Sequence, residues 1–447
     1  MLSDMYVWAW LTGRIDPVVA GVLQSSGEDL HFAYAESYLK RSDAVPLSPT
    51  LPLGGQWFTE VEDMRMPSAL RDAAPDAWGR RVILDKVTGA HGLDADVNTL
   101  HESVYLLESG SNRFGAVDFQ ERHDVYVPRE ETATLDELHQ AAELLDAGEP
   151  LSEPLARALV RGTSIGGARP KALLKGSDGT EYIAKFSSSS DIFPVVGAEA
   201  ASLYLAREAE MDVSEARMAH SLGKDVLLVK RFDREQKGTR KMTVSALTLL
   251  GLGEMTSRYG TYPEIVNAVM ENGGEESTAE EMFRRIAFNI AISNTDDHLR
   301  NHAAFWDGNK LSLTPAYDLS PMSRTGDTAR QAIAYGANGE RESSFSELIG
   351  VASVYGLSKS DALNEVDRVR ATITDNWDDA ADFARLSASD RNALFGRQFL
   401  HPAASYGMSA PVRQAPVSTY TPRAELCEAP RKRDGGPCQR RGRCPHH

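Results

Sequence analysis

Cysteine is nearly absent from this sequence. All three cysteines lie close to the C-terminal end, at Cys427, Cys438 and Cys444. Disulfides therefore play no part in holding the preceding residues together, which suits a reducing compartment. Long apolar runs are missing too, because stretches such as VVGAEAASLYLA, residues 195–206, are interrupted by Gly or Glu well before the ~20 residues that a bilayer span needs. We expect no membrane helix.

Basic residues are outnumbered by acidic ones. The chain carries 48 Lys and Arg against 64 Asp and Glu, a formal net charge of -16. This balance argues against broad nucleic-acid binding by the main body, because a phosphate-binding surface needs clustered cations. The exception is the stretch from Ser405 onward, where eight basic residues accompany three acidic ones. The first residues, MLSDMYVWAWLTGRIDPVV, lack the features of a signal peptide, so we expect a cytoplasmic protein.

The N-terminal part contains a pattern of short strands. Residues 5–11 favour a strand, and residues 18–35 indicate a hairpin with its turn at Ser25–Glu28. Residues 67–90 then favour a helix, ahead of a second strand-like patch, NRFGAVDF. We expect a small, mostly β N-terminal unit.

The following part begins with a helix. Thr134 and Glu137 form a T-x-x-E capping box that opens it. Beyond it the pattern predicts strand, strand, helix, strand and strand, followed by long helical stretches. Residues 171–186 indicate a hairpin, and residues 196–211 have helical spacing. Residues 279–293 place their large apolar side chains on one helical face.

The length favours two to three domains, and we place the main boundary between residues 122 and 150. The expected parts are an N-terminal subdomain over 1–122, a catalytic domain over 150–402, a flexible tether over 403–426 and a basic Cys/His tail over 427–447. The tether is expected because it has few large aliphatic residues and three prolines.

The stretch NTDDHLRNHAAFW crowds Asp296, Asp297 and Asn301 directly after a predicted helix, and Asp318 follows in a strand-like segment. Phosphoryl transfer from ATP needs a metal held by carboxylate and amide oxygens, and a carboxylate near the incoming hydroxyl. The spacing of Asp296 and Asn301 matches kinase catalytic loops, which makes Asp318 a candidate second metal ligand. Singly, each residue has a plainer interpretation: the spacing is common in loops, Asp318 could cap a turn, and Asp297 and His298 could be structural.

Two further features could handle phosphate groups. Lys185 lies within the apolar strand EYIAKF, where either ATP phosphates or Glu199 could supply an anion. The alternative is a lysine that reaches solvent from an edge strand. The stretch SIGGARPK offers Gly166, Gly167 and two cations beside a strand, which suits either a phosphate-covering loop or an ordinary tight turn.

These elements occur in the order found in protein kinases: glycine loop, strand lysine, helix glutamate, hinge strand, catalytic loop and metal aspartate. At these residues the sequence resembles the HipA family of toxin serine/threonine kinases, over about residues 5–400. The motifs that carry the resemblance are VWAWLTGR, DAVPLSPTLPL, PDAWGR, SIGGARPK, AKF, VKRFDR, NTDDHLRNH and LTPAYDLSP. The resemblance implies an α+β fold, in which a small, mostly β subdomain precedes a two-lobed kinase-like domain with a helical C-lobe.

The resemblance also implies roles for individual residues. Carried over by motif, Asp296 is the catalytic base, and Asn301 and Asp318 are the ligands of Mg²⁺. Lys185 is the lysine that binds the phosphates of ATP.

Two other motifs gain roles in the same way. Ser164 corresponds to the family's autophosphorylated serine, where phosphate could expel the glycine loop and switch the enzyme off. A plain turn serine is the alternative. VKRFDR marks the hinge between lobes, where backbone near Lys230 and Phe232 would meet adenine and Asp233 could bond the ribose.

The C-terminal tail departs from the kinase pattern. Its spacing C-x10-C-x5-C-x2-H, formed by Cys427, Cys438, Cys444 and His447, could complete a tetrahedral Zn²⁺ site, with His446 competing as the fourth ligand. The alternative is a disordered basic tail with incidental cysteines. A basic zinc knuckle could bind nucleic acid or a partner.

The resemblance implies a kinase that uses ATP and Mg²⁺ to phosphorylate a protein hydroxyl, usually on an aminoacyl-tRNA synthetase, and so arrests translation and growth. Members of the family are commonly neutralised by a small DNA-binding antitoxin, so we expect a HipB-like partner. Two alternatives remain open. One is a catalytically silent scaffold that binds an antitoxin and, through it, operator DNA; the other is a small-molecule phosphotransferase with the same catalytic loop.

Overall fold

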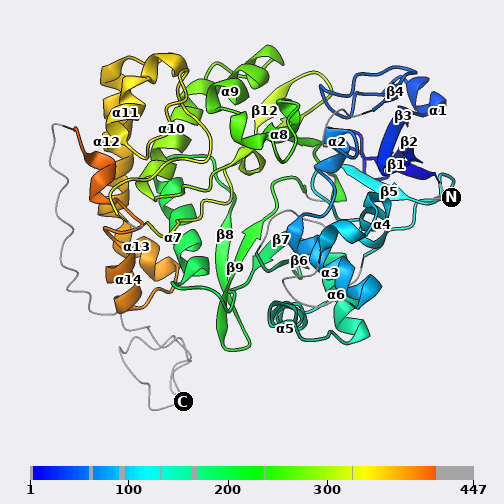
Figure 1. The fold of residues 1–447 in the computed structure, drawn as a ribbon, viewed down its shortest axis with the longest axis horizontal. Coiled ribbons are helices and arrows are strands. Elements are labelled where there is room, and N and C mark those ends of the chain that lie inside the picture. The colour runs from blue at the N-terminus through cyan, green and yellow to red at the C-terminus, as the bar shows by residue number, and fades with distance from the viewer. Residues whose placement is uncertain are drawn as a thin grey trace, which may run out of the picture. The chain divides into compact units, whose positions relative to one another are not determined.

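The computed structural model describes residues 4–59, 64–89, 96–130, 133–162, 169–235, 238–324 and 326–408, with backbone alone at 161 and 162. The described residues belong to one compact unit. Figure 1 shows a sheet near the N-terminus, a second sheet in the middle and helices on the other side. None of the helices described is both long enough and apolar enough to cross a bilayer.

An antiparallel sheet with the strand order β4-β3-β2-β1-β5 dominates the N-terminal part. Its strands are β1 (Met5–Ala9), β2 (Val18–Ser26), β3 (Asp29–Tyr34), β4 (Trp57–Phe58) and β5 (Val117–Gln120). β2 and β3 pair as far as Ser26 with Asp29, and Gly27 makes the turn with a φ of 67°. Glycine suits this position because it has no Cβ to oppose a positive φ. The predicted hairpin is confirmed.

Short helices accompany this sheet and lead into the next part. They are α1 (Glu36–Leu39), α2 (Ser68–Arg71), α3 (Ala77–Thr88), α4 (Glu102–Glu108), α5 (Leu135–Asp146) and α6 (Glu153–Gly162). The single helix expected over 67–90 was wrong: α2 and α3 are separate, and Pro75 between them lacks the N–H that a continuous helix needs. The capping box of α5 is confirmed, since Thr134 and Glu137 each accept the other's backbone N–H. The sequence analysis did not predict α6.

The central sheet has the order β6-β7-β9-β8. The elements are β6 (Lys171–Lys175), β7 (Glu181–Lys185), α7 (Val195–Glu208), β8 (Ala216–Ser221) and β9 (Lys224–Lys230). This is the predicted sequence of two strands, a helix and two strands. In the β6–β7 hairpin, Lys171 pairs with Lys185.

The remaining elements form a small sheet and a group of helices. The strands β10 (Thr243–Ser245), β11 (Ala303–Trp306) and β12 (Leu311–Leu313) are antiparallel neighbours in that order. The helices are α8 (Ala246–Leu249), α9 (Tyr262–Glu271), α10 (Thr278–Ala291), α11 (Phe345–Gly350), α12 (Lys359–Asp375), α13 (Trp377–Phe383) and α14 (Ala388–Leu394). α10 buries the predicted apolar face, and in Figure 1 the later helices gather beside α7 and α10. The α+β class with a helical C-terminal part is confirmed.

The hydrophobic cores cross the expected boundary at 122–150. The N-terminal sheet packs together with Val244 of β10 and Trp306 of β11 in one cluster. Trp78 of α3 packs with Phe186 and the central sheet in another, and its Nε1 donates to the Lys171 carbonyl at 3.0 Å. Burial of one such aromatic side chain is favourable by about 1.5–3 kcal/mol. The N-terminal part is thus held against both the sheet and the helical part, and the domain division stays a prediction.

Candidate active site

A cavity of about 1150 Å³ is lined by the central sheet and α7 on one side and by the loop after α10 on the other. The described residues that were predicted to form the site all line it: Lys185, Lys230, Phe232, Asp233, Asp296, Asn301 and Asp318. Ser164, Gly166 and Gly167 lie outside the described residues, as do Cys427, Cys438, Cys444 and His447. The glycine loop and the zinc site therefore stay predictions.

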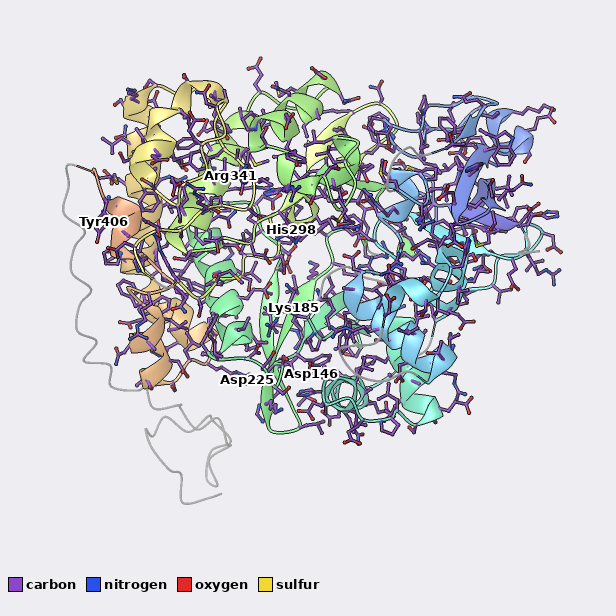
Figure 2. The ribbon with its side chains drawn as sticks, viewed as in Figure 1. Asp146, Lys185, Asp225, His298, Arg341 and Tyr406 are labelled. Carbon is purple, nitrogen blue, oxygen red and sulfur yellow. The ribbon has the colours of Figure 1, made fainter. Side chains whose placement is uncertain are left out.

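Lys185, whose position is labelled in Figure 2, connects two carboxylates in this cavity. It ends β7, where Ala184 and Phe186 are buried in the core and Lys185 faces the opposite side, as the alternation predicted. Its Nζ donates to Oε1 of Glu199 in α7 at 2.5 Å and to Oδ1 of Asp318 at 2.6 Å. A strand, a helix and a distant loop thus meet at one ammonium group.

The electrostatics of this cluster favour a charged lysine. Burial lowers the pKa of Lys185, but Asp318 and Glu199 outweigh it and raise that pKa above its usual value. Lys185 in turn holds the pKa of Asp318 well below its usual range. Burial raises the pKa of Glu199, against the pull of Lys185. Lys185 therefore favours the ionised form of Asp318.

Asp318 lies in a loop, and its expected position in a strand was wrong. β12 ends at Leu313, and only Ala316 makes an isolated bridge, to Val213. Asp318 has a φ of 57°, a left-handed backbone conformation that residues other than glycine rarely adopt. Such strain is found at functional sites, where the surroundings hold it. The turn directs the carboxylate to Lys185.

The loop after α10 is anchored by Asp297. Its Oδ2 accepts from the Tyr262 hydroxyl at 2.5 Å and from Asn289 Nδ2 at 2.7 Å, and lies 2.8 Å from His302 Nε2. Asp297 is 1% exposed. Its role is structural, which was one of the two interpretations that the sequence left open. The neighbouring Asp296 is exposed and faces the cavity instead.

Asp296 and Asn301 lie together in this loop, because Asn301 Nδ2 donates to the Asp296 carbonyl at 3.4 Å. Burial raises the pKa of Asp296, His298 lowers it and Asp318 raises it again, with a net upward shift. A carboxylate with a raised pKa accepts a proton more readily, which suits a general base.

Arg300 is a contributor that the sequence analysis missed. It lies between the two predicted site residues of the loop, with Nη1 at 3.2 Å from Asp76 Oδ1 and Nε donating to Glu254 at 2.9 Å. Its backbone carbonyl accepts from the Tyr317 hydroxyl at 2.7 Å. Asp76 belongs to PDAWGR, so this ion pair ties the N-terminal part to the loop that carries Asp296. Asp76 and Arg300 are far apart in the sequence, so only the tertiary structure reveals this role of Arg300.

Of the predicted hinge residues, Phe232 sits in an aromatic cluster and Asp233 in a charged one. The Phe232 ring lies 6.2 Å from Phe114 and 5.4 Å from Tyr317, and all three line the cavity. Lys230 forms an exposed ion pair with Glu215 at 2.9 Å.

The carboxylate of Asp233 is held from several sides. It accepts from Arg231 Nη2 at 2.7 Å, from Arg234 Nη1 at 3.1 Å and from the backbone N–H of Gly115 at 2.8 Å. Burial raises its pKa, but the two arginines outweigh burial and lower it to about 2. This cluster gives Asp233 a structural role, and its expected bond to a ribose stays a prediction without geometric support.

Lys171 is a second lysine facing the cavity. It pairs with Lys185 across the hairpin and is 7% exposed. Burial lowers its pKa, although Asp318 opposes this shift. Arg169, beside it in SIGGARPK, forms an ion pair of 2.5 Å with Asp191. Both cations of the motif line the cavity.

The donor set of the cavity fits a magnesium nucleotide. Within the described parts of the chain, no group of three or more His, Cys, Asp or Glu side chains is arranged to hold a metal by itself. The cavity does offer the carboxylate of Asp318, the amide of Asn301 and the carboxylate of Asp296. Mg²⁺ usually takes one or two protein carboxylates and completes its shell with water and phosphate oxygens. Lys185 and Lys171 would supply positive charge for those phosphates.

Two comparisons show what this chain is similar to. The chain is similar to a curated protein, "Putative kinase Y4mE" of Sinorhizobium fredii, with 24% identity over 341 residues, which cover 69% of this chain and 76% of that protein. A solved structure of the Shewanella oneidensis MR-1 toxin-antitoxin system, HipA with HipB and its operator DNA, matches with a TM-score of 0.62 and 16% identity. That match covers 90% of this chain and 99% of that one, and it supports the fold.

A third likeness is weaker. The Helicobacter pylori proinflammatory kinase CtkA matches with a TM-score of 0.39 and 14% identity, over 54% of this chain and 92% of that one, which adds nothing to the assignment.

The family models are decisive. The model of the HipA N-terminal domain matches residues 11–120, and that of the HipA-like C-terminal domain matches residues 163–377. Together they span most of the sequence, including every described site residue, and the chain belongs to the HipA family.

Proposed function

We propose that the protein is a kinase that uses ATP and Mg²⁺ to phosphorylate a serine or threonine hydroxyl of another protein. The observation that carries this proposal is the position of Lys185, which bonds both Glu199 and Asp318 in the cavity that Asp296 and Asn301 also line. A lysine paired with a helix glutamate beside a metal-binding aspartate is the arrangement that protein kinases require.

Each residue has a distinct task in this proposal. When bound, magnesium ATP supplies the phosphoryl group and the metal that offsets its charge. Asp318 and Asn301 hold the metal, and Lys185 fixes the phosphates while Glu199 fixes Lys185. Asp296 orients the acceptor hydroxyl and takes its proton, as its raised pKa favours.

The rim of the cavity supports a protein as the acceptor. Three apolar side chains that line it are exposed: Ile192 by 83%, Met255 by 72% and Met322 by 38%. Exposed apolar side chains beside a binding cavity suit contact with a protein substrate, and methionine adapts to varied partners. A small-molecule phosphotransferase has no evident use for them.

The partners follow from the family and remain part of the proposal. The Shewanella oneidensis structure contains HipB and operator DNA, which supports a HipB-like antitoxin as a partner here. An aminoacyl-tRNA synthetase as the substrate, growth arrest as the outcome and self-limitation by phosphorylation of Ser164 are predictions that rest on the resemblance alone.

Transfer of labelled phosphate tests the proposal. The purified chain is incubated with γ-labelled ATP, Mg²⁺ and a bacterial protein extract, beside Asp296→Asn and the exposed helix variant Asp375→Asn. General-base catalysis contributes about 10²–10⁴-fold, so the first variant should lose that much and the second should match the parent. Label that enters only small alcohols or sugars would favour the phosphotransferase, and equal, negligible labelling by all three would favour the silent scaffold.

A further inference from the structure

A second cavity, of about 170 Å³, lies behind the loop that carries Asp296. Most of its lining residues bear a hydroxyl or a guanidinium group: Ser293, Thr295, Ser323, Thr328, Arg324 and Arg330. The first two belong to the turn between α10 and Asp296, and the others belong to the segment that follows Asp318. The cavity is thus polar and carries positive charge.

Several hydrogen-bonding atoms at this cavity have no partner among the residues that the structure describes. Nε and Nη1 of Arg324 and Oγ of Ser293 are buried, and no residue in the described ranges bonds to them. Ser293 is 0% exposed. Arg324 uses Nη2 to donate to the Asp327 carbonyl, which holds the guanidinium in place. Buried donors are almost always paired in native proteins, so orphans that line a polar cavity point to a ligand.

The charges around the cavity favour an anion. Burial lowers the pKa of Arg324, and Asp327 and Tyr406 oppose that shift. The Asp327 side chain does not line the cavity, and it accepts from the Tyr406 hydroxyl at 3.3 Å. Arg330 stands at the rim, 71% exposed, in an ion pair of 2.6 Å with Glu342. The position of Tyr406 is labelled in Figure 2.

The donors of Arg324 and the volume of the cavity further restrict which ligands can bind. Nε and Nη1 of Arg324 lie on different edges of the planar guanidinium group, so each offers a separate hydrogen bond to an oxyanion such as phosphate. Hydroxyl groups can satisfy its remaining oxygens. A volume of about 170 Å³ is below the ~300 Å³ at which sites for drug-sized ligands begin, so a nucleotide would not fit.

We propose that this cavity is an oxyanion site that binds phosphate, either free inorganic phosphate or the phosphate monoester of a phosphorylated side chain. Arg324 is its principal ligand, and Ser293 donates a hydrogen bond from the opposite wall. The site is separate from the proposed nucleotide site and does not depend on phosphate transfer.

The site is joined to the active site through the backbone. Met322 N donates to the Ser293 carbonyl at 3.1 Å, and Met322 and Ser323 line both cavities. Ser293 has a φ of 53° at the end of α10, a conformation that glycine adopts without strain. Its replacement by glycine therefore removes the hydroxyl and leaves the turn intact.

Calorimetric titration of the full chain with inorganic phosphate tests the site. The variants are Arg324→Gln, Ser293→Gly and the exposed control Arg258→Ala, with Lys185→Met to remove phosphate binding in the large cavity. We expect Arg324→Gln to abolish binding and Ser293→Gly to weaken it roughly 10-fold, the effect of one hydrogen bond to a charged group. Arg258→Ala and Lys185→Met should bind phosphate as the parent does.

The outcomes are separable. Thermal melting shows whether Arg324→Gln is folded, and Ser293→Gly should melt no earlier than the parent. Binding that survives both Arg324→Gln and Ser293→Gly, binding that Lys185→Met removes, or no binding by the parent would each overturn the proposal. A second titration with phosphoserine separates the two sources: tighter binding than inorganic phosphate identifies a phosphorylated side chain, and weaker binding identifies the free ion. These titrations give their answer even if the protein transfers no phosphate.

Discussion

Two charged clusters border the large cavity, and they use their charges differently. In the first, Lys185 joins Glu199 and Asp318, and the Asp318 side chain remains 39% exposed. In the second, Asp233 is held by Arg231 and Arg234, and its side chain is 3% exposed. The first cluster presents an ionised carboxylate to a ligand, whereas the second directs its carboxylate to the protein itself.

The difference shows that a buried charge in a cavity wall does not identify a functional group. Asp233 and Asp318 both have a lowered pKa and both line the cavity. What separates them is the partner: Asp233 also accepts from the backbone of Gly115, so the second cluster fastens the N-terminal part to the hinge. A pair whose charges are fully bonded within the protein serves cohesion, while an exposed one can exchange its partner for substrate or metal.

The largest effect should come from the cavity cluster. Asp318→Ala removes a proposed metal ligand, and we expect phosphate transfer to fall by at least about 100-fold. The free energy of unfolding should change little, because Lys185 keeps its bond to Glu199. Initial rates with γ-labelled ATP and a urea titration measure the two quantities. The contrast between the two clusters would fail if Asp318→Ala lost as much free energy of unfolding as it lost in transition-state stabilisation.

The hinge cluster should respond in the opposite way. Asp233→Asn leaves Arg231 and Arg234 with only the more distant carboxylate of Glu181, at 3.7 and 3.6 Å, and breaking a buried pair costs about 3–5 kcal/mol. We expect urea denaturation to shift by that amount, with residual activity in proportion to the folded fraction. An exposed pair provides the control: Arg385→Ala, which loses its 2.9 Å contact with Asp225, should shift stability by less than about 1 kcal/mol.

The pH dependence of stability sharpens the same point. The pKa of Asp233 is about 2 in the folded protein against an ordinary value of 3.8. A lowered folded pKa contributes stability that is fully present above 3.8 and is lost as the pH falls through 2. The parent should therefore lose more stability than Asp233→Asn between pH 4 and pH 2. Urea titrations between pH 4 and pH 2 measure the free energy of unfolding of both proteins. An equal loss in the parent and in Asp233→Asn would contradict the role of Asp233.

The smallest effect concerns Phe114, which lines the cavity beside the second cluster. Residues 112–115 are bonded by Arg231 and Arg234, and Phe114 in that segment meets Phe232 at the cavity. Phe114→Ala removes an aromatic contact worth about 0.5–1.5 kcal/mol. We expect weaker nucleotide binding by a few-fold, with a small change in melting temperature. Nucleotide titration measures the affinity, and unchanged affinity would remove the N-terminal part from the nucleotide site.

Local patterns predicted the elements that carry the site. The β2–β3 hairpin, the capping box of α5 and the buried face of α10 follow from short-range rules, because turns, caps and periodicity depend on near neighbours. The same rules failed where a neighbour distant in sequence decides the conformation. Asp318 was expected in a strand, and its left-handed turn is held by Lys185 and by Asn294 from other segments.

The sequence by itself determined which chemical groups are available: two carboxylates and an amide after an amphipathic helix, a lysine in an apolar strand, and the family to which the motifs belong. Only the tertiary structure decided which of those groups face a ligand. Asp296 and Asp297 are adjacent in the chain, yet one is exposed to the cavity and the other is enclosed by Tyr262, Asn289 and His302. The reason is physical: a carboxylate acts on a ligand only where the fold leaves its oxygens unbonded, and that depends on residues far away in the sequence.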